Sequence, residues 1–322
     1  MRFNLAAVDA DATQRAAMHR AMLDMARFAD RNGFFDVSLA EHHGTQLGWT
    51  PSPLPLTAAL LGATERVRVG IAALVLPLHD PIRIAEDVAA IDLAFGNRFG
   101  LICALGYRSE EYAAFGKDWA GRGALFDRCL EALLTAWEGE PFTYDGRPVH
   151  VTPTPVSRPH PAVFIGGASK AAARRAARFG LGLAPQDHLP ALQAFYESEC
   201  ATRGTTPMCL MPPPHLMTTH VSEDPDRAWA TYGHYFLAES TAYNAWQPAG
   251  STSAVHSPAT TVDGLRADGP FQILTPDDFV AQLREAGPSA YAFFHPLVGG
   301  LPIDEAWHSL ELYINEVVPA LK

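Results

Sequence analysis

Glu41-His42-His43 places three ionisable side chains in a row at the end of a predicted strand, Phe35–Ala40. An imidazole titrates near neutral pH, so a histidine at this point could act as a general acid or base. Adjacent strand residues point to opposite faces, and we therefore expect at most one of the two histidines to face a site. A lone histidine is also common as a packing residue, so both interpretations stay open on this motif alone.

Polar residues also follow two later predicted strands. His79 follows the strand predicted at Val67–Val75, where it could simply cap the next helix. Tyr107 and Arg108 follow the strand predicted at Arg98–Leu105, and they could offer an aromatic ring and a cation to a ligand. No HxH or HExxH spacing accompanies the histidines, and we predict no metal site.

The turn Gly166-Gly167-Ala168-Ser169 lies between a predicted strand and a predicted helix. Two glycines let the backbone approach a ligand closely, and the helix start offers free N–H groups and a positive dipole end. Ser169 can add a hydroxyl and Lys170 a charge, so the turn predicts a site for one compact anion. The arginines that follow on this helix fit a solvated outer face better: Arg174, Arg175 and Arg178.

Short β-rich runs alternate with helical patterns along the chain, and repeated βα units imply a parallel sheet. Eight such units favour an α/β fold of the (β/α)8 TIM-barrel type, whose active site lies at the carboxyl ends of the strands. The first β-to-α turn has no glycine, which argues against a dinucleotide-binding Rossmann fold. The predicted strands are Arg2–Val8, Phe35–Ala40, Val67–Val75, Arg98–Leu105, Ala162–Ile165, Leu181–Ala184, His215–Val221 and Ala290–Phe294.

Two segments interrupt this alternation, and we expect a single barrel domain over residues 1–322 with insertions at about 144–161 and 244–269. The first insertion is rich in proline and holds two short β-like pieces around Gly146. The second has no periodicity after the helix predicted at Pro225–Leu237. It is either a lid over the barrel mouth or a disordered surface insertion.

Composition narrows the possible partners. The chain of 322 residues is 48% hydrophobic and carries 24 basic against 35 acidic residues, a net charge of −11. A core of good size is expected, while nucleic acid and anionic membranes are improbable partners. The four cysteines lack zinc spacing, no run of 18 apolar residues occurs, and the first residues predict a strand instead of a signal peptide. We therefore expect a cytoplasmic location.

These motifs together resemble the bacterial luciferase-like family of flavin-dependent oxidoreductases along most of the chain. The combination of Glu-His-His with Leu-Pro-x-His-x-Pro is the specific element. The matching segments are Ser38–His43, Gly62–Glu65, Val69–Pro77, His79–Asp87, Gly106–Tyr112 with Phe115-Gly116, Gly166–Ser169 and Gly299–Pro302.

The resemblance implies a (β/α)8 barrel with insertions that uses reduced FMN or the deazaflavin F420, often with dioxygen. It places the flavin ring near Ala72 and Ala73, where the family commonly has a non-prolyl cis peptide, and the phosphate on Gly167, Ala168 and Ser169. It matches His42 to the catalytic histidine. Tyr107 and Gly166 complete the predicted cofactor-binding residues.

Departures from luciferase bear on the substrate. Ala104 and Leu105 stand where the luciferase α-chain has a cysteine and an arginine, which argues against light emission. A family arginine that can contact the phosphate aligns near Gly123, with Arg122 adjacent.

We predict a flavin-dependent monooxygenase that uses reduced FMN and dioxygen on a small apolar organic substrate. A separate flavin reductase would supply the cofactor, and a homodimer is expected. Three alternatives stay open: an F420-dependent hydride-transfer oxidoreductase on the same barrel, a non-catalytic flavin-binding protein, and a metal-dependent barrel hydrolase. Aromatic residues could line the substrate pocket: Trp49, Tyr107, Phe115 and Trp246.

Overall fold

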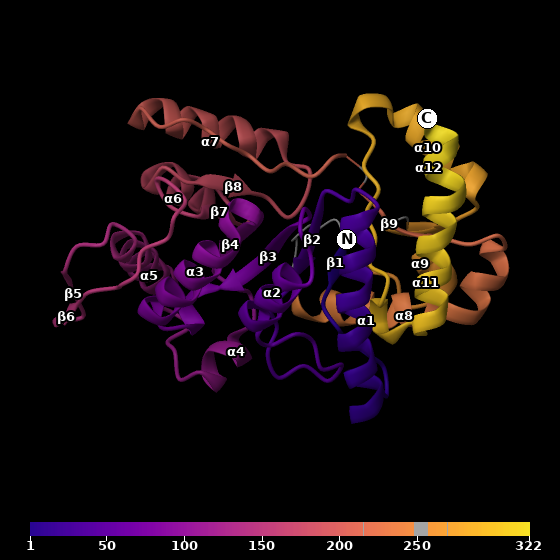
Figure 1. The fold of residues 1–322 in the computed structure, drawn as a ribbon, viewed down its shortest axis with the longest axis horizontal. Coiled ribbons are helices and arrows are strands. Elements are labelled where there is room, and N and C mark those ends of the chain that lie inside the picture. Colours follow the sequence, from indigo (N-terminus) through magenta and orange to yellow (C-terminus); the bar gives the residue numbers. More distant parts are fainter. Residues whose placement is uncertain (215, 248–256, 269) are drawn as a thin grey trace.

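Parallel strands form the centre of the molecule and helices pack around them (Figure 1). The computed structural model describes residues 1–214, 216–247, 257–268 and 270–322. Its main sheet has six strands in the order β1-β2-β3-β4-β7-β8, and all its neighbours are parallel. These strands are β1 (Arg2–Phe3), β2 (Asp36–Leu39), β3 (Arg68–Val75), β4 (Phe99–Ala104), β7 (Ala162–Gly166) and β8 (Gly182–Ala184).

Residues 290–294 connect this sheet to a second parallel pair, β9 (Thr218–Val221) and β10 (Phe271–Leu274). The amide of Arg2 donates to the carbonyl of Phe294 at 2.8 Å, and the amide of Thr219 donates to the carbonyl of Phe293 at 2.8 Å. The strand order therefore continues from β1 through residues 293–294 to β9 and β10. The chain adopts the TIM-barrel fold that the sequence predicts.

Several helices begin where a side chain accepts from a free amide, or where a proline at the first position removes one. Asp11 and Gln14 form a reciprocal capping box at the first helix, and Asp80 and Ser169 cap two others. The helices are α1 (Ala12–Arg31), α2 (Pro53–Gly62), α3 (Pro81–Phe95), α4 (Ser109–Ala114), α5 (Arg122–Ala136), α6 (Lys170–Phe179), α7 (Pro190–Arg203), α8 (Pro225–Trp246), α9 (Val262–Asp268), α10 (Pro276–Ala286), α11 (Ile303–Leu312) and α12 (Val318–Leu321).

The first and last predicted strands are shorter than expected. Pairing in β1 ends at Phe3, because Leu5 has a φ of 55° and the side chain of Asn4 accepts a hydrogen bond from the Ala6 amide, which turns the chain. The segment predicted as strand Ala290–Phe294 pairs at a single bridge between Thr218 and Phe293. Position 215, within the predicted strand His215–Val221, lies outside the described residues.

The two interruptions differ from each other. Residues 142–149 form an antiparallel hairpin, β5 (Phe142–Tyr144) and β6 (Arg147–Val149), which confirms the two β pieces around Gly146. The helix predicted to end at Leu237 continues nine residues to Trp246, and α9 lies within 244–269, so the prediction of a segment without periodicity is wrong in part. The strand β10, which the sequence analysis does not predict, follows. The proposed lid falls partly on residues 248–256 and 269, which lie outside the described residues.

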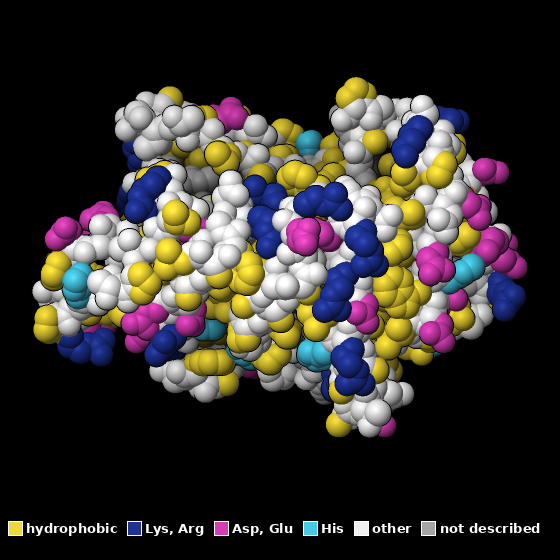
Figure 2. Space-filling model, in the orientation of Figure 1, with side chains coloured by type: hydrophobic (Ala, Val, Ile, Leu, Met, Phe, Trp, Pro, Cys, Tyr) yellow, Lys and Arg dark blue, Asp and Glu magenta, His cyan; other side chains and the backbone are white. Residues whose placement is uncertain are grey.

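A continuous apolar core fills the space between the strands and the helices. Alternate residues of the strands and the inner faces of α1, α3 and α5 contribute to it. On the face shown in Figure 2, basic and acidic side chains are interspersed. In the described part of the chain, no helix combines the length and the apolar character needed to span a bilayer.

Asp92 on α3 fixes the segment that leads into β7. Its side chain is buried and accepts hydrogen bonds from the amides of Val156 and Ser157, at 2.7 and 2.8 Å, and from the Ser157 hydroxyl. We expect Asp92→Ala to lower the free energy of unfolding by about 2–4 kcal/mol, because three donors lose their buried acceptor. Urea denaturation measures this. Asp87→Ala, on the same helix but half-exposed, should change stability by less than about 0.5 kcal/mol, and equal effects of the two would contradict the assignment.

Candidate active site

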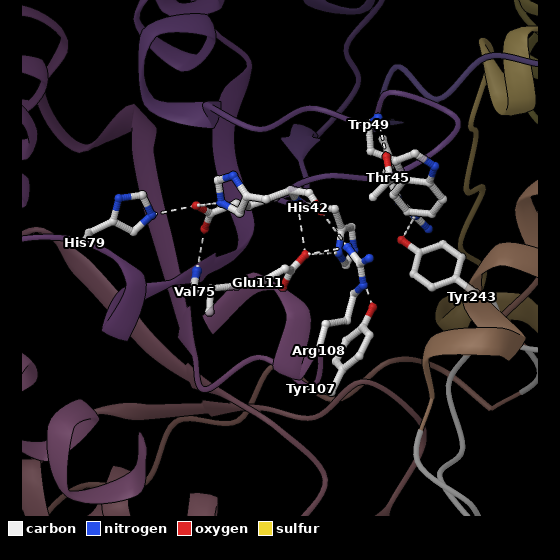
Figure 3. A network of polar contacts seen from close by, with 12 residues as sticks. His42, Thr45, Trp49, Val75, His79, Tyr107, Arg108, Glu111 and Tyr243 are labelled. Carbon is white, nitrogen blue, oxygen red and sulfur yellow. Dashed lines mark hydrogen bonds and ion pairs between the residues drawn. The ribbon is translucent and has the colours of Figure 1, made fainter. Parts of the chain in front are cut away.

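His42 lies at the carboxyl end of β2, within a group of aromatic rings (Figure 3). It is 8% exposed, and its ring centroid is 4.9 Å from Trp49, 5.0 Å from Trp246, 5.8 Å from Tyr107 and 5.9 Å from Tyr243. Trp49 and Tyr107 come from the segments that follow β2 and β4. Tyr243 and Trp246 come from the last turns of α8, beyond the end predicted for this helix.

Two groups face the nitrogens of His42. Oε1 of Glu111 lies 3.5 Å from Nδ1, and the hydroxyl of Tyr107 lies 3.4 Å from Nε2. Burial lowers the pKa of His42, Arg108 and Arg2 lower it further, and Glu111 opposes these effects without reversing them. The imidazole is therefore neutral at neutral pH and can accept a proton.

Glu111 is held firmly at the start of α4. Its Oε1 accepts from the amide of His43 at 3.0 Å and from Nη1 of Arg108 at 2.9 Å. Nη1 also donates to the carbonyl of His43 at 2.7 Å, and the guanidinium lies 4.4 Å from the ring centroid of Trp246. Burial alone would raise the pKa of Glu111, but its contacts with His42, the His43 amide and Arg108 hold it below the usual range. The carboxylate is ionised.

Glu41 joins the ends of β2 and β3. Its Oε1 accepts from Nε2 of His43 at 2.9 Å and Nε2 of His79 at 2.5 Å, and its Oε2 accepts from the amide of Val75 at 2.5 Å. Burial would raise the pKa of Glu41, but these donors lower it to about 2. His79 therefore contacts a carboxylate, and the residue that caps the next helix, α3, is Asp80.

Glu41, His43 and His79 also bring three potential metal ligands within 4.8 Å of one another. Each imidazole Nε2 already bonds to the carboxylate, so these atoms are satisfied without a cation. The absence of a metal from the reaction stays a prediction.

A second buried charge cluster lies beneath the aromatic rings. Arg2 on β1 contacts Glu239 and the hydroxyl of Tyr243, both on α8, and Nδ1 of His295 lies 3.2 Å from Glu239. Burial would raise the pKa of Glu239, but His295 and Arg2 lower it to about 2. This ion pair attaches α8 to the barrel and thereby positions Tyr243 and Trp246. No sequence motif marked Glu239, because it lies nearly 240 positions from Arg2.

The strands beside His42 are bare on one face. Ala72 is exposed although β3 has neighbours on both sides, and Ala73, Ala104 and Gly166 are partly accessible. These four residues are small, so they leave room at the carboxyl ends of β3, β4 and β7. The Ala72–Ala73 peptide is cis, as the resemblance implies.

The Gly-Gly turn is built as predicted between β7 and α6. A Cβ on Gly166 would lie 2.9 Å from Cγ2 of Ile102, and Gly167 has a φ of 140°, a conformation that favours glycine. The hydroxyl of Ser169 caps α6 at the amide of Ala172. Ala168 and Ser169 are exposed, so the start of α6 is open to an anion.

Arg174 and Arg178 of α6 face outward, as the sequence favours, whereas the side chain of Arg175 is only 13% exposed and lies against α5. Arg175 and Arg178 pair with Asp127 on α5, and Arg174 lies 3.7 Å from Glu199 on α7. Lys170 is exposed, and its ammonium lies 5.1 Å from the ring centroid of Phe195.

The structure brings some predicted residues together and keeps others apart. Trp49, Tyr107 and Trp246 contact His42, whereas Phe115 packs on His43 and is 41% exposed. Arg122 stacks on Trp119, 3.7 Å from its centroid. The residues that sequence reasoning missed are Arg2, Glu239, Tyr243 and the hydrogen-bonding role of Glu111. The sequence marked Glu111 only as an acidic residue in the first turn of the helix that begins at Ser109.

The fold and site thus combine an α/β barrel, a buried histidine at the end of its second strand and an open Gly-Gly turn after its fifth strand. The family model described as luciferase-like monooxygenase matches residues 1–291. The chain therefore belongs to the luciferase-like monooxygenase family.

Curated relatives match over part of their sequences. The alkanal monooxygenase alpha chain of Photorhabdus laumondii is 32% identical over 175 residues, 52% of this chain and 48% of the relative. The oxygenase component of a flavin-dependent trigonelline monooxygenase from Acinetobacter baylyi is 25% identical over 162 residues, 48% of this chain and 45% of the relative. The chain thus spans about half the length of the curated relatives it matches.

Solved structures share the fold along nearly the whole chain. The monooxygenase RslO1 from Streptomyces bottropensis has a TM-score of 0.75 at 21% identity and full coverage of both chains. The oxygenating constituent of 3,6-diketocamphane monooxygenase from Pseudomonas putida, in complex with FMN, has a TM-score of 0.65 at 16% identity, and the match covers 97% of this chain and 94% of that one. An F420-dependent secondary alcohol dehydrogenase has a TM-score of 0.66 at 16% identity, and the match covers 94% of this chain and 96% of that one.

The charge on Glu41 makes the free energy of unfolding depend on pH. A pKa lowered from 4.5 to about 2 corresponds to about 3 kcal/mol. This contribution is fully present above pH 4.5 and is lost as the pH falls toward 2. We expect Glu41→Gln to lower the free energy of unfolding by about 3 kcal/mol at pH 7 and by clearly less near pH 3.

Urea denaturation at both pH values measures this difference. Glu285→Gln removes a similar charge from an exposed position and serves as the control. A destabilisation by Glu41→Gln that does not change with pH would show that the loss comes from packing and not from the carboxylate charge.

Proposed function

We propose that this protein is a flavin-dependent monooxygenase that uses reduced FMN and dioxygen on a small apolar organic substrate. One observation carries the proposal: a buried, neutral imidazole, His42, stands at the strand ends where the backbone of β3 is left bare at Ala72. When bound, reduced FMN supplies the electrons that activate dioxygen, and the protein supplies binding, orientation and proton transfer.

The residues present fit such a cofactor. The exposed backbone at Ala72 and Ala73 offers a surface for a flat ring, and Gly166 keeps this surface free of a side chain that would collide with Ile102. We assign the phosphate to the turn Gly167-Ala168-Ser169, where backbone amides and the positive end of α6 attract an anion. Tyr107 would border the ring on the side of His42.

His42 would exchange a proton with the reacting group, and the aromatic residues around it would exclude water. Trp49, Tyr243 and Trp246 give the site an apolar wall, which supports an apolar substrate. We further propose that a separate reductase supplies the reduced flavin, since the trigonelline relative is named an oxygenase component. A homodimer belongs to the same proposal.

An F420-dependent oxidoreductase is the second candidate, because a protein with that cofactor shares the fold. Fluorescence titration with FMN, reduced FMN and F420 separates the candidates. We expect the protein to bind reduced FMN at submillimolar concentration. Binding of F420 but of neither form of FMN would overturn the cofactor assignment, and binding of no flavin would overturn the whole proposal.

Gly166→Ala tests where the flavin lies. Its Cβ would meet Ile102 at 2.9 Å and Ala104 at 3.4 Å, so the open strand face must shift. We expect FMN affinity to fall about tenfold, a loss of about 1.4 kcal/mol. Gly100→Ala, at the opposite end of the neighbouring strand with no atom within 4 Å, is the matched control and should bind normally. Unchanged affinity in Gly166→Ala would exclude this face as the flavin site.

His42→Ala tests catalysis apart from binding. We expect FMN affinity to stay within about threefold, while turnover falls by roughly 10²- to 10⁴-fold, because the general acid or base is lost. Titration gives the affinity, and oxidation of reduced FMN with decanal as a probe substrate gives the turnover. A variant with full turnover would remove His42 from the mechanism.

A further inference from the structure

Glu111 faces one nitrogen of His42 and Tyr107 faces the other (Figure 3). We propose that Glu111 is the positioning residue of His42: its carboxylate takes the Nδ1–H of the imidazole, so that Nε2 is the atom that exchanges protons in the site. This inference rests on the proposed function. It identifies Nε2 as the nitrogen of His42 that exchanges protons, and Glu111 as the residue that fixes this choice.

The carboxylate is placed for this role before any ligand binds. Its Oε1 is held by the His43 amide at 3.0 Å and by Nη1 of Arg108 at 2.9 Å, and Nδ1 of His42 lies 3.5 Å away. Nδ1 is buried and has no hydrogen-bond partner at present. A small rotation of the imidazole would bring Nδ1 within ordinary hydrogen-bond distance of this oxygen.

Among the described residues, the other groups that contact or act on His42 offer Nδ1 no comparable acceptor. Arg108 and Arg2 are cations that act on His42 from the start of α4 and from β1. Tyr107 lies at Nε2, and Tyr243 on α8 contacts His42 through its ring. Among the groups that act electrostatically on His42, Glu111 is the carboxylate.

The hydroxyl of Tyr107 lies 3.4 Å from Nε2 of His42. Burial raises the pKa of Tyr107 well above its usual value, so the hydroxyl keeps its proton and can donate it to Nε2. In the tautomer that we propose, Nε2 carries the lone pair and accepts from Tyr107, while Nδ1 carries the proton and faces Glu111. When the reacting group releases a proton, Nε2 takes it, and the imidazolium formed keeps its Nδ1–H against the negative carboxylate. The return of the proton from Nε2 restores the neutral ring.

A purely structural role for Glu111 is the competing explanation, because the same carboxylate holds the His43 amide and Arg108. Glu111→Gln separates the two, since its amide oxygen can still accept from both donors while the negative charge is lost. Glu110→Gln is the matched control, with the same change at the adjacent, exposed position of α4. Glu111→Asp restores the charge on a shorter side chain.

The test measures His42 directly in the free protein. The side chains of ¹⁵N-histidine-labelled protein are titrated by NMR, and His42 is assigned from the His42→Ala variant. We expect the Nδ1–H tautomer in the wild type. The pKa of His42 should fall in Glu111→Gln, because the negative charge that raises it is gone, and Glu111→Asp should recover most of the shift. An Nε2–H tautomer in the wild type, or equal pKa values in Glu111→Gln and Glu110→Gln, would overturn the proposal.

Turnover provides a second measurement. With reduced FMN, dioxygen and decanal, we expect kcat of Glu111→Gln to fall about tenfold or more with little change in KM. The acid limb of the pH–rate profile should move to lower pH, the direction in which the pKa of His42 moves. Glu110→Gln should leave both unchanged. If the protein shows no turnover with this probe, the flavin proposal is in question, while the NMR titration still decides the role of Glu111.

Discussion

The carboxylate of Glu41 is the interaction on which the site depends. It joins the end of β2 to the end of β3 through the Val75 amide, and it fixes His43 and His79 on either side. With both neighbours of His42 in the chain held, the His42 ring has a defined place beside the bare strand face. A buried anion costs free energy unless donors surround it. Three donors surround the carboxylate of Glu41, which explains how a charge can be buried at the strand ends of a largely apolar barrel.

The rest of the site is brought in by α8 and α4, which are distant in sequence from Glu41. The buried pair of Arg2 and Glu239 attaches α8 to the first strand, and the helix then carries two aromatic rings to His42. Arg108, at the start of α4, attaches that helix to the segment after β2 by donating to the carbonyl of His43. The arrangement separates two tasks: small residues on β3, β4 and β7 leave room, while bulky residues from the loops and α8 close the apolar side.

Much of this could be predicted from the sequence, and the exceptions have physical causes. Apolar runs and turn residues located the central strands, and strand ends located His42, Tyr107 and the Gly-Gly turn. The end of α8 was predicted nine residues early, because its last turns are stabilised by tertiary contacts of Glu239 and Tyr243 instead of a clear apolar stripe. The strand β10 was missed, since a run of four residues carries little periodic signal. Long-range pairs such as that of Arg2 with Glu239 leave no trace in local spacing.

Arg108 couples the carboxylate of Glu111 to the indole ring of Trp246. Its guanidinium contacts Glu111 on one side and the ring of Trp246 on the other. A cation–π contact of this kind contributes about 0.5–2 kcal/mol. A ligand that displaces Trp246 therefore also alters the electrostatic field that Glu111 and Arg108 exert on the imidazole. By linkage, a proton on His42 must alter the affinity for that ligand by the same factor. The position of Trp246 at the end of α8 and the protonation of His42 are thus thermodynamically coupled.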